Sequence, residues 1–111
     1  MPTASELGLV KGDIVRCGRP VCANYKIEYC DPRGQYHEVG GTRLTGLDMN
    51  DGPRVEVLET DFRIPGHGCS YTRVKFIDRD FFNGAVHRNP GDETIIHDRY
   101  VGFIAPVQRG E

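Results

Sequence analysis

The chain has 111 residues, of which 38% are hydrophobic and 27% are charged, and its formal net charge is −2. This length predicts one domain, residues 1–111, without room for a separate catalytic domain. No apolar run approaches the roughly 20 residues that a membrane-spanning helix needs, and the first residues lack the basic and apolar regions of a secretory signal. We therefore expect a cytoplasmic protein that does not act at a membrane.

The first third of the chain predicts a short turn and then two strands. A capping-box pattern near the N-terminus is followed so soon by Gly8 that any helix there is about one turn long. The segment Lys11–Val15 predicts a turn that leads into a first strand ending near Cys17. Residues 25–30 alternate between apolar and polar side chains, which predicts a second strand with Tyr25, Ile27 and Tyr29 on one face.

The middle of the chain predicts a hairpin and a further strand. Asp31–Gly34 has the composition of a tight turn, so residues 35–39 are expected to pair back against the second strand. Gly40 and Gly41 are expected to end this hairpin. Residues 54–62 alternate again and predict the next strand, which is followed by the proline- and glycine-containing loop 64–68.

Residues 72–86 are expected to form the centre of the core. Val74 and Phe76 alternate with charged residues, as a half-buried strand requires. The polar triplet Asp78–Asp80 then interrupts the pattern, and the apolar residues of 81–86 follow. This arrangement predicts a hairpin between the two apolar runs, with an aromatic inner face.

Two more strands are predicted near the C-terminus, at 94–97 and 101–107. The chain contains 14 glycines and seven prolines, which separate short segments of period two. The predicted fold class is all-β: a small, mostly antiparallel barrel or sandwich of six to eight strands with little helix. If Lys11–Val15 opens a barrel, that barrel is SH3-like.

The cysteines were tested as metal ligands. Cys17, Cys22, Cys30 and His37 have the right chemistry for zinc and lie in one third of the chain, which makes them weak candidates. Their spacing lacks the close Cys-x-x-Cys pairs of most zinc sites. We therefore expect structural thiols, with Cys17 and Cys30 on neighbouring strands, and neither a metal nor a cofactor.

Catalytic patterns were tested next. The loop with His67 and Cys69 offers a base beside a nucleophile, and a small hydrolase or nuclease is one alternative function. Loop histidines without a chemical role explain the same residues, and the chain lacks the common hydrolase, metalloprotease and nucleotide-binding motifs. We assign no catalytic residue and do not expect an enzyme.

Arginine and tyrosine give the clearest functional indication. The chain has eleven arginines and only three lysines, together with five tyrosines, and Arg and Tyr commonly anchor protein interfaces. A coding bias toward arginine explains the same count, because the arginines are spread along the chain. The predicted binding residues are Arg16, Arg19, Tyr25, Tyr29, Arg33 and Tyr36.

The function expected from this composition is a non-enzymatic binding or assembly module that docks on a protein partner, with homo-oligomers as a further expectation. Small cofactor-free proteins of this size are typical of phage and mobile-element accessory proteins, such as virion components and inhibitors of host defence, which would place the chain in the host cytoplasm or the virion. The alternative is a nucleic-acid-binding small β-barrel that uses the same Arg and Tyr residues. The net charge of −2 makes that partner less favoured.

Overall fold

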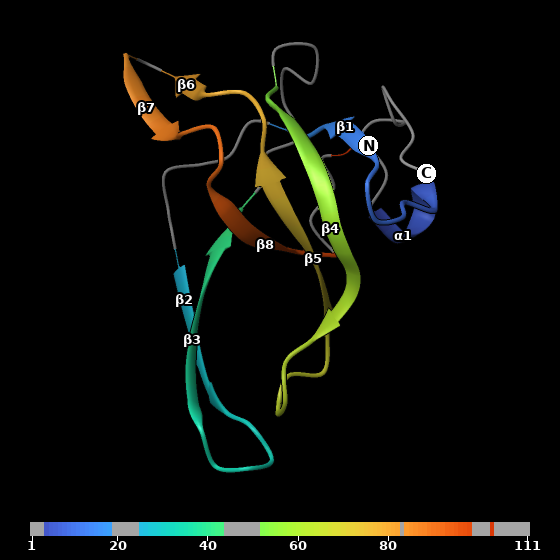
Figure 1. Cartoon of the computed structure of the whole chain (residues 1–111), viewed down its shortest axis with the longest axis vertical. Helices are drawn as coiled ribbons and strands as arrows, with labels where there is room; N and C mark the ends of the chain where they lie inside the picture. The colour runs from blue at the N-terminus through green and yellow to red at the C-terminus, as the bar shows by residue number, and fades with distance from the viewer. Residues whose placement is uncertain (1–3, 19–24, 44–51, 83, 99–102, 104–111) are drawn as a thin grey trace.

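The computed structural model describes residues 4–18, 25–43, 52–82, 84–98 and 103, and nearly all of its regular structure is β (Figure 1). Within these residues one helical turn, α1 (Ala4–Leu7), precedes eight strands. The strands are β1 (Ile14–Arg16), β2 (Tyr25–Cys30), β3 (Tyr36–Thr42), β4 (Arg54–Arg63), β5 (Ser70–Phe76), β6 (Asp80–Phe82), β7 (Ala85–Arg88) and β8 (Glu93–His97). No helix in this part of the chain is long and apolar enough to cross a membrane. The prediction of a mostly β fold with little helix is confirmed.

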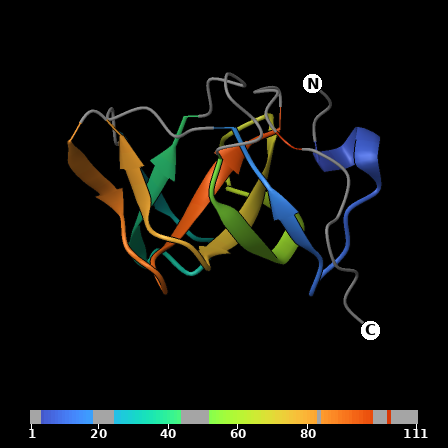
Figure 2. The ribbon, with the colours of Figure 1, turned by 90° about the horizontal axis from the view of Figure 1, so that it is seen from above.

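Six of the described strands form one sheet in the order β1-β4-β5-β8-β3-β2, and β6 and β7 form a separate hairpin. Neighbouring strands of the sheet are antiparallel except β3 and β8, which are parallel. The predicted predominance of antiparallel pairing is therefore also confirmed. β1 and β2 lie at the two edges of the sheet. Figure 2 shows α1 and the β6–β7 hairpin at opposite ends of the molecule.

Both faces of the sheet carry buried apolar side chains. Ile95 and Ile96 are consecutive in β8, so their side chains point to opposite faces, and they belong to different hydrophobic clusters. The first cluster contains Ala4, Leu9, Val15, Cys17, Val55, Val57, Val74, Phe76, Ile96 and Phe103. The second contains Ile27, Ile64, Tyr71 and Ile95, with Tyr29, Val39, Phe62 and Cys69 packed against it. The second cluster joins the β2–β3 hairpin to the ends of β4 and β5.

The N-terminal turn is tied to the sheet by one carboxylate. Asp98 Oδ2 accepts hydrogen bonds from the hydroxyls of Ser5 in α1 and Ser70 in β5, and Asp98 Oδ1 accepts one from Thr72. These bonds place α1 over the first cluster, where Ala4 is buried. Phe103 pairs with Cys17 in an isolated antiparallel bridge and is fully buried in the same cluster.

The predicted hairpin between residues 72–77 and 81–86 is wrong. β5 pairs with β4 on one side and with β8 on the other, so both of its edges are occupied. β6 therefore pairs with β7, where Phe81 lies opposite Val86. Phe81 is 57% exposed and Val86 is 44% exposed, so Phe81 and Val86 do not line the core. Phe76, by contrast, is buried as expected, at 1% exposure.

The prediction that Gly40 and Gly41 end the hairpin is also wrong, because both residues continue β3. Gly41 pairs with Tyr25 of β2 and with Ile95 of β8. Glycine permits a turn but does not impose one, and ladder bonds to two neighbours hold this segment extended. The strand predicted at 101–107 lies outside the described residues apart from Phe103.

The buried position of Phe76 gives the first testable prediction. Phe76→Ala should lower the free energy of unfolding by about 3 to 5 kcal/mol, since it removes a buried aromatic ring from the first cluster. Phe81→Ala is the matched control and should change stability by less than about 0.5 kcal/mol, because its ring is mostly in solvent. Urea titration measures both values, and equal effects of the two substitutions would contradict the assignment of the core.

Candidate functional site

The β2–β3 hairpin runs along the long axis of the molecule, and its turn forms one end of the structure (Figure 1). β2 and β3 pair along six residues, from Tyr25 opposite Gly41 to Cys30 opposite Tyr36. In the described residues, β3 pairs with β8 only at Gly41 and Thr42. The remainder of β3 has β2 as its neighbour, so most of the hairpin extends past the shared sheet.

The inner face of the hairpin packs against the second cluster. Ile27 is 8% exposed, and Val39 lies opposite it in the ladder. Next to this pair the rings of Tyr29 and His37 stack, with centroids 5.0 Å apart and planes inclined by 19°. These contacts fix the hairpin against the ends of β4 and β5, although few backbone bonds join it to the sheet.

One carboxylate organises the turn of the hairpin. Asp31 Oδ1 accepts hydrogen bonds from the backbone N–H groups of Arg33 and Gln35, both at 2.9 Å. Asp31 Oδ2 lies 3.0 Å from His37 Nε2. The hydrogen bond with His37, followed by that from Gln35, lowers the pKa of the Asp31 carboxyl. Gly34 adopts a φ of +85°, which glycine accepts without strain, and the turn is therefore well defined.

The outer face of the hairpin presents a fixed aromatic ring to solvent. Tyr36 is 58% exposed, and its hydroxyl donates a 2.5 Å hydrogen bond to Glu28 on the adjacent strand. This hydrogen bond is the main cause that raises the pKa of Tyr36 to about 12, so the phenol stays protonated at neutral pH. The exposed Cys30 lies directly opposite Tyr36 in the ladder. An ordered ring with a polar end is a group that suits recognition of another protein.

The structure brings together some of the predicted binding residues and separates others. Tyr25, Tyr29, Arg33 and Tyr36 all belong to the hairpin, with Arg33 exposed at its turn. Tyr29 faces inward against His37, whereas Tyr36 points to solvent. Arg16 lies on β1 at the opposite edge of the sheet, where its Nη1 donates to the carbonyl of Gly52 at 2.8 Å. Arg19 lies outside the described residues.

The expectation that Cys17 and Cys30 lie on neighbouring strands is wrong, because β1 and β2 are the two opposite edges of the sheet. Cys17 is fully buried, and burial together with the charge of Asp80 raises its pKa. His37 pairs with Tyr29, the residue before Cys30 in β2. Because consecutive side chains of a strand point to opposite faces, Cys30 and His37 lie on opposite faces of the hairpin. Cys22 lies outside the described residues, and within those residues no group of three or more metal-ligating side chains is found.

In the loop that carries His67 and Cys69, the cysteine side chain packs against the core and the histidine is exposed. His67 is exposed in a turn in which its N–H donates to the carbonyl of Ile64 at 2.9 Å. The Cys69 thiol lies 3.4 Å from the hydroxyl of Tyr71 and donates to it, and the side chain packs against the second cluster. The hydrogen-bond partner of this thiol is thus a phenol, which does not activate it as a nucleophile in the way a base does.

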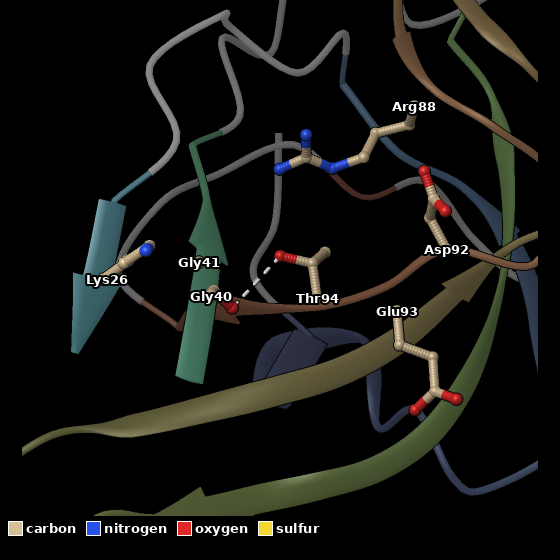
Figure 3. A pocket seen from close by; sticks show the side chains of 7 residues that line it. All are labelled: Lys26, Gly40, Gly41, Arg88, Asp92, Glu93 and Thr94. Atoms are coloured by element: carbon tan, nitrogen blue, oxygen red, sulfur yellow. Dashed lines mark hydrogen bonds between the residues drawn. The ribbon is translucent and has the colours of Figure 1, made fainter. Parts of the chain in front are cut away.

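A pocket of about 290 Å³ lies at the base of the hairpin (Figure 3). Sequence reasoning did not find it, because its walls come from β2, β3, β7, β8 and the turn before β8. The lining residues are Lys26, Gly40, Gly41, Arg88, Asp92, Glu93 and Thr94. The adjacent glycines give the one local signal in the sequence, because two residues without side chains in a strand leave space for a ligand or another chain.

Comparison with known proteins assigns no family to the chain. Family models give no match, and neither curated proteins nor solved structures match it significantly.

The second prediction concerns the titration of Asp31. Its folded-state pKa is lowered, so the ionised carboxylate stabilises the turn above the usual Asp pKa of about 3.9, and this contribution disappears as the pH falls through the folded-state value. NMR titration of the Arg33 and Gln35 amides should show a midpoint below about pH 3.9. Asp31→Asn keeps an acceptor oxygen but should lack this transition. A midpoint at or above the usual value would contradict the proposed hydrogen bonding.

Proposed function

We propose that this protein is a non-enzymatic binding module that docks on a protein partner through the outer face of the β2–β3 hairpin. The observation that carries the proposal is the exposed ring of Tyr36, which is held in place by Glu28 on a hairpin that extends past the sheet. Tyrosine loses little conformational freedom on binding, especially when its hydroxyl is already bonded. The outer face therefore offers contact area at low entropic cost.

The edge of the sheet adds a second means of recognition. β2 is an edge strand of the described sheet, and an edge strand presents backbone groups with which an extended segment of a partner can pair. Arg33 is exposed at the adjacent turn and supplies a guanidinium for carboxylates on the partner. Together the edge, Tyr36 and Arg33 form a continuous docking surface.

Several finer predictions belong to this proposal. Closure of the sheet into an SH3-like barrel or sandwich stays a prediction, because the described strands form an open sheet with β1 and β2 at its edges. A role as a phage or mobile-element accessory protein, and the cytoplasmic location that goes with it, rest on size and composition. The predicted homo-oligomer would form when the β2 edges of two copies of the chain pair with each other.

The third prediction tests the docking surface. Protein carrying an affinity tag is used to capture partners from lysate of its native host, and the captured partner is then purified and its Kd measured by titration. Tyr36→Ala should weaken binding by about 30-fold, the effect of losing a 2 kcal/mol hot-spot side chain. Phe81→Ala is the matched control, since Phe81 is 57% exposed on β6 and Tyr36 is 58% exposed. Equal Kd values for both variants would contradict the proposal.

The fourth prediction separates protein docking from nucleic-acid binding. Arg16 lies on edge strand β1 and Arg33 lies in the turn of the hairpin that contains the opposite edge strand β2, which does not favour a shared phosphate-binding face. We expect no binding to DNA or RNA tighter than about 10 μM at about 150 mM salt, weaker than typical specific sites. Fluorescence anisotropy with random oligonucleotides measures it. Submicromolar affinity that falls by roughly a thousand-fold between about 50 and 200 mM salt would favour the nucleic-acid alternative.

A further inference from the structure

The edge of β2 presents the backbone groups of three residues on the side where the described sheet ends. In the turn of the hairpin the N–H of Asp31 donates to the carbonyl of Gln35 at 2.9 Å, so the backbone groups of Asp31 face β3. The N–H and C=O groups of successive strand residues point alternately to the two sides of the strand. The backbone groups of Lys26, Glu28 and Cys30 therefore face away from β3, toward the edge.

The side chains of β2 carry a charge pattern that complements itself. Lys26 and Glu28 have opposite charges two residues apart on the outer face, and both are exposed. When two copies of an edge strand pair antiparallel about a two-fold axis perpendicular to the sheet, side chains that lie opposite each other are on the same face. With the axis at Ile27, Lys26 of each copy lies opposite Glu28 of the other. Opposite charges in this position stabilise a sheet.

The neighbouring registers are less favourable. An axis at Lys26 places this residue opposite its own copy, an axis at Glu28 does the same for Glu28, and like charges directly opposite each other destabilise a sheet. An axis at Tyr29 brings Pro32 opposite Lys26, and proline has no N–H with which to extend the ladder. The charges and the proline together select the axis at Ile27.

The hairpin also contains an acidic pair for which a second copy supplies the counter-charge. Glu28 lies directly opposite Glu38 in the ladder between β2 and β3, where like charges repel each other. Lys26 lies 3.4 Å from Glu38, and Glu28 accepts a hydrogen bond from the neutral hydroxyl of Tyr36. Lys26 of a second copy would lie beside Glu28 on the side away from Glu38. Pairing of two copies would thus offset the repulsion within each hairpin.

The inner face of β2 is compatible with the same axis. Because the backbone groups of Lys26 and Glu28 point to the edge, they form the hydrogen-bonded pair across the axis, and the two copies of Ile27 form a non-hydrogen-bonded pair. The Cα atoms of such a pair are only about 4.5 Å apart, which brings the side chains close together. Ile27 belongs to the second cluster, so the apolar clusters of the two copies would meet at this point.

We propose that the β2 edge pairs antiparallel with the β2 edge of a second copy of the chain, about a two-fold axis at Ile27. This inference rests on the proposed use of the edge for docking, and it names a second copy as the partner there. Lys26 and Glu28 form two interchain ion pairs and exchange backbone hydrogen bonds with the other copy, which makes one continuous sheet. Tyr36 lies on β3, one strand away from the axis, so its ring remains exposed.

The fifth prediction concerns the mass of the protein in solution. A contact along one short strand lies at the small end of protein interfaces, so we expect a Kd of about 10 to 100 μM. Sedimentation equilibrium of the full chain from about 1 to 500 μM should show a mass that rises from monomer to dimer and stops there, because each copy has used its β2 edge. A reducing agent excludes dimers linked by a disulfide through the exposed Cys30. A monomer at every concentration, or growth beyond the dimer, would overturn the proposal.

Amide hydrogen exchange locates the contact. In the monomer the N–H groups of Lys26 and Glu28 face the edge, and in the dimer they donate across the axis. Their exchange should therefore slow at least about tenfold between the lowest and the highest protein concentration. The N–H of Ile27 faces β3 in both states and should change much less. A dimer in which Lys26 and Glu28 exchange as fast as in the monomer would place the contact elsewhere and overturn the assignment.

Charge reversal tests the register. Lys26→Glu and Glu28→Lys each place like charges opposite each other at both positions, and each should raise the Kd of self-association at least about tenfold. An equimolar mixture of the two variants restores a Lys opposite a Glu at both positions, so it should form a dimer with a Kd within about threefold of the original. Lys11→Glu is the matched control, because Lys11 is exposed in the turn before β1 and its reversal should leave the Kd unchanged.

A mixture that does not associate, although the spectrum of each variant shows it folded, would overturn the register. Tyr36→Ala separates this inference from the proposed function, since the variant should keep the original Kd of self-association and lose affinity for a different protein. Loss of self-association in Tyr36→Ala as large as in Lys26→Glu would place the contact on the outer face and contradict pairing through the edge. A monomeric protein whose binding to another protein requires Tyr36 would overturn the dimer alone.

Discussion

The position of the hairpin depends on a short parallel joint between β3 and β8. In the described residues this joint consists of Gly41 beside Ile95 and Thr42 beside Ile96. The hydroxyls of Thr42 and Thr94 are buried there and bond to each other. A buried hydroxyl without a partner costs about 1 to 3 kcal/mol, so this pair specifies where the strands meet. The same Thr42 also receives Arg88, which links the β6–β7 hairpin to the joint.

The burial of both faces of the central strands explains why the hairpin remains ordered away from the joint. The second cluster contains both Ile95 of β8 and Ile27 of β2. Apolar packing therefore holds the hairpin beyond the residues where β3 and β8 pair. Among the described residues, the outer face contributes no side chain to either cluster, and it carries Lys26, Glu28, Cys30, Tyr36 and Glu38. One face of the hairpin thus stabilises the fold, while the other is exposed.

Local sequence patterns predicted the strands well and their partners poorly. Period-two alternation identified β2 and β4, and a run of β-branched residues identified β8. The partner of β5 was misassigned, because alternation records which face is buried and carries no information about which strand lies alongside. The sequence Asn83-Gly84 did signal a tight hairpin between β6 and β7, and it would have corrected the error.

The candidate site shows the same division between local and long-range information. Tyr36 and Arg33 were predicted from the abundance of Arg and Tyr in the sequence, whereas Arg88 was missed because it lies 46 residues beyond the Thr42 that it contacts. The metal hypothesis was based on four candidate ligands within one third of the chain, but this proximity in sequence does not bring Cys17 and Cys30 together, because β1 and β2 are at opposite edges of the sheet. Sites assembled from several strands depend on topology, which a single sequence does not specify.

The charges around the β2 edge would restrict the kind of partner that could dock as proposed. Lys26 and Glu28 lie on the outer face of β2, and charged side chains on edge strands oppose unselective pairing with other strands. Glu28 already accepts the hydrogen bond from Tyr36, so an approaching carboxylate would meet like charge at that position. A segment that docks as proposed would therefore place cationic or neutral groups over Glu28 and an acceptor near Lys26.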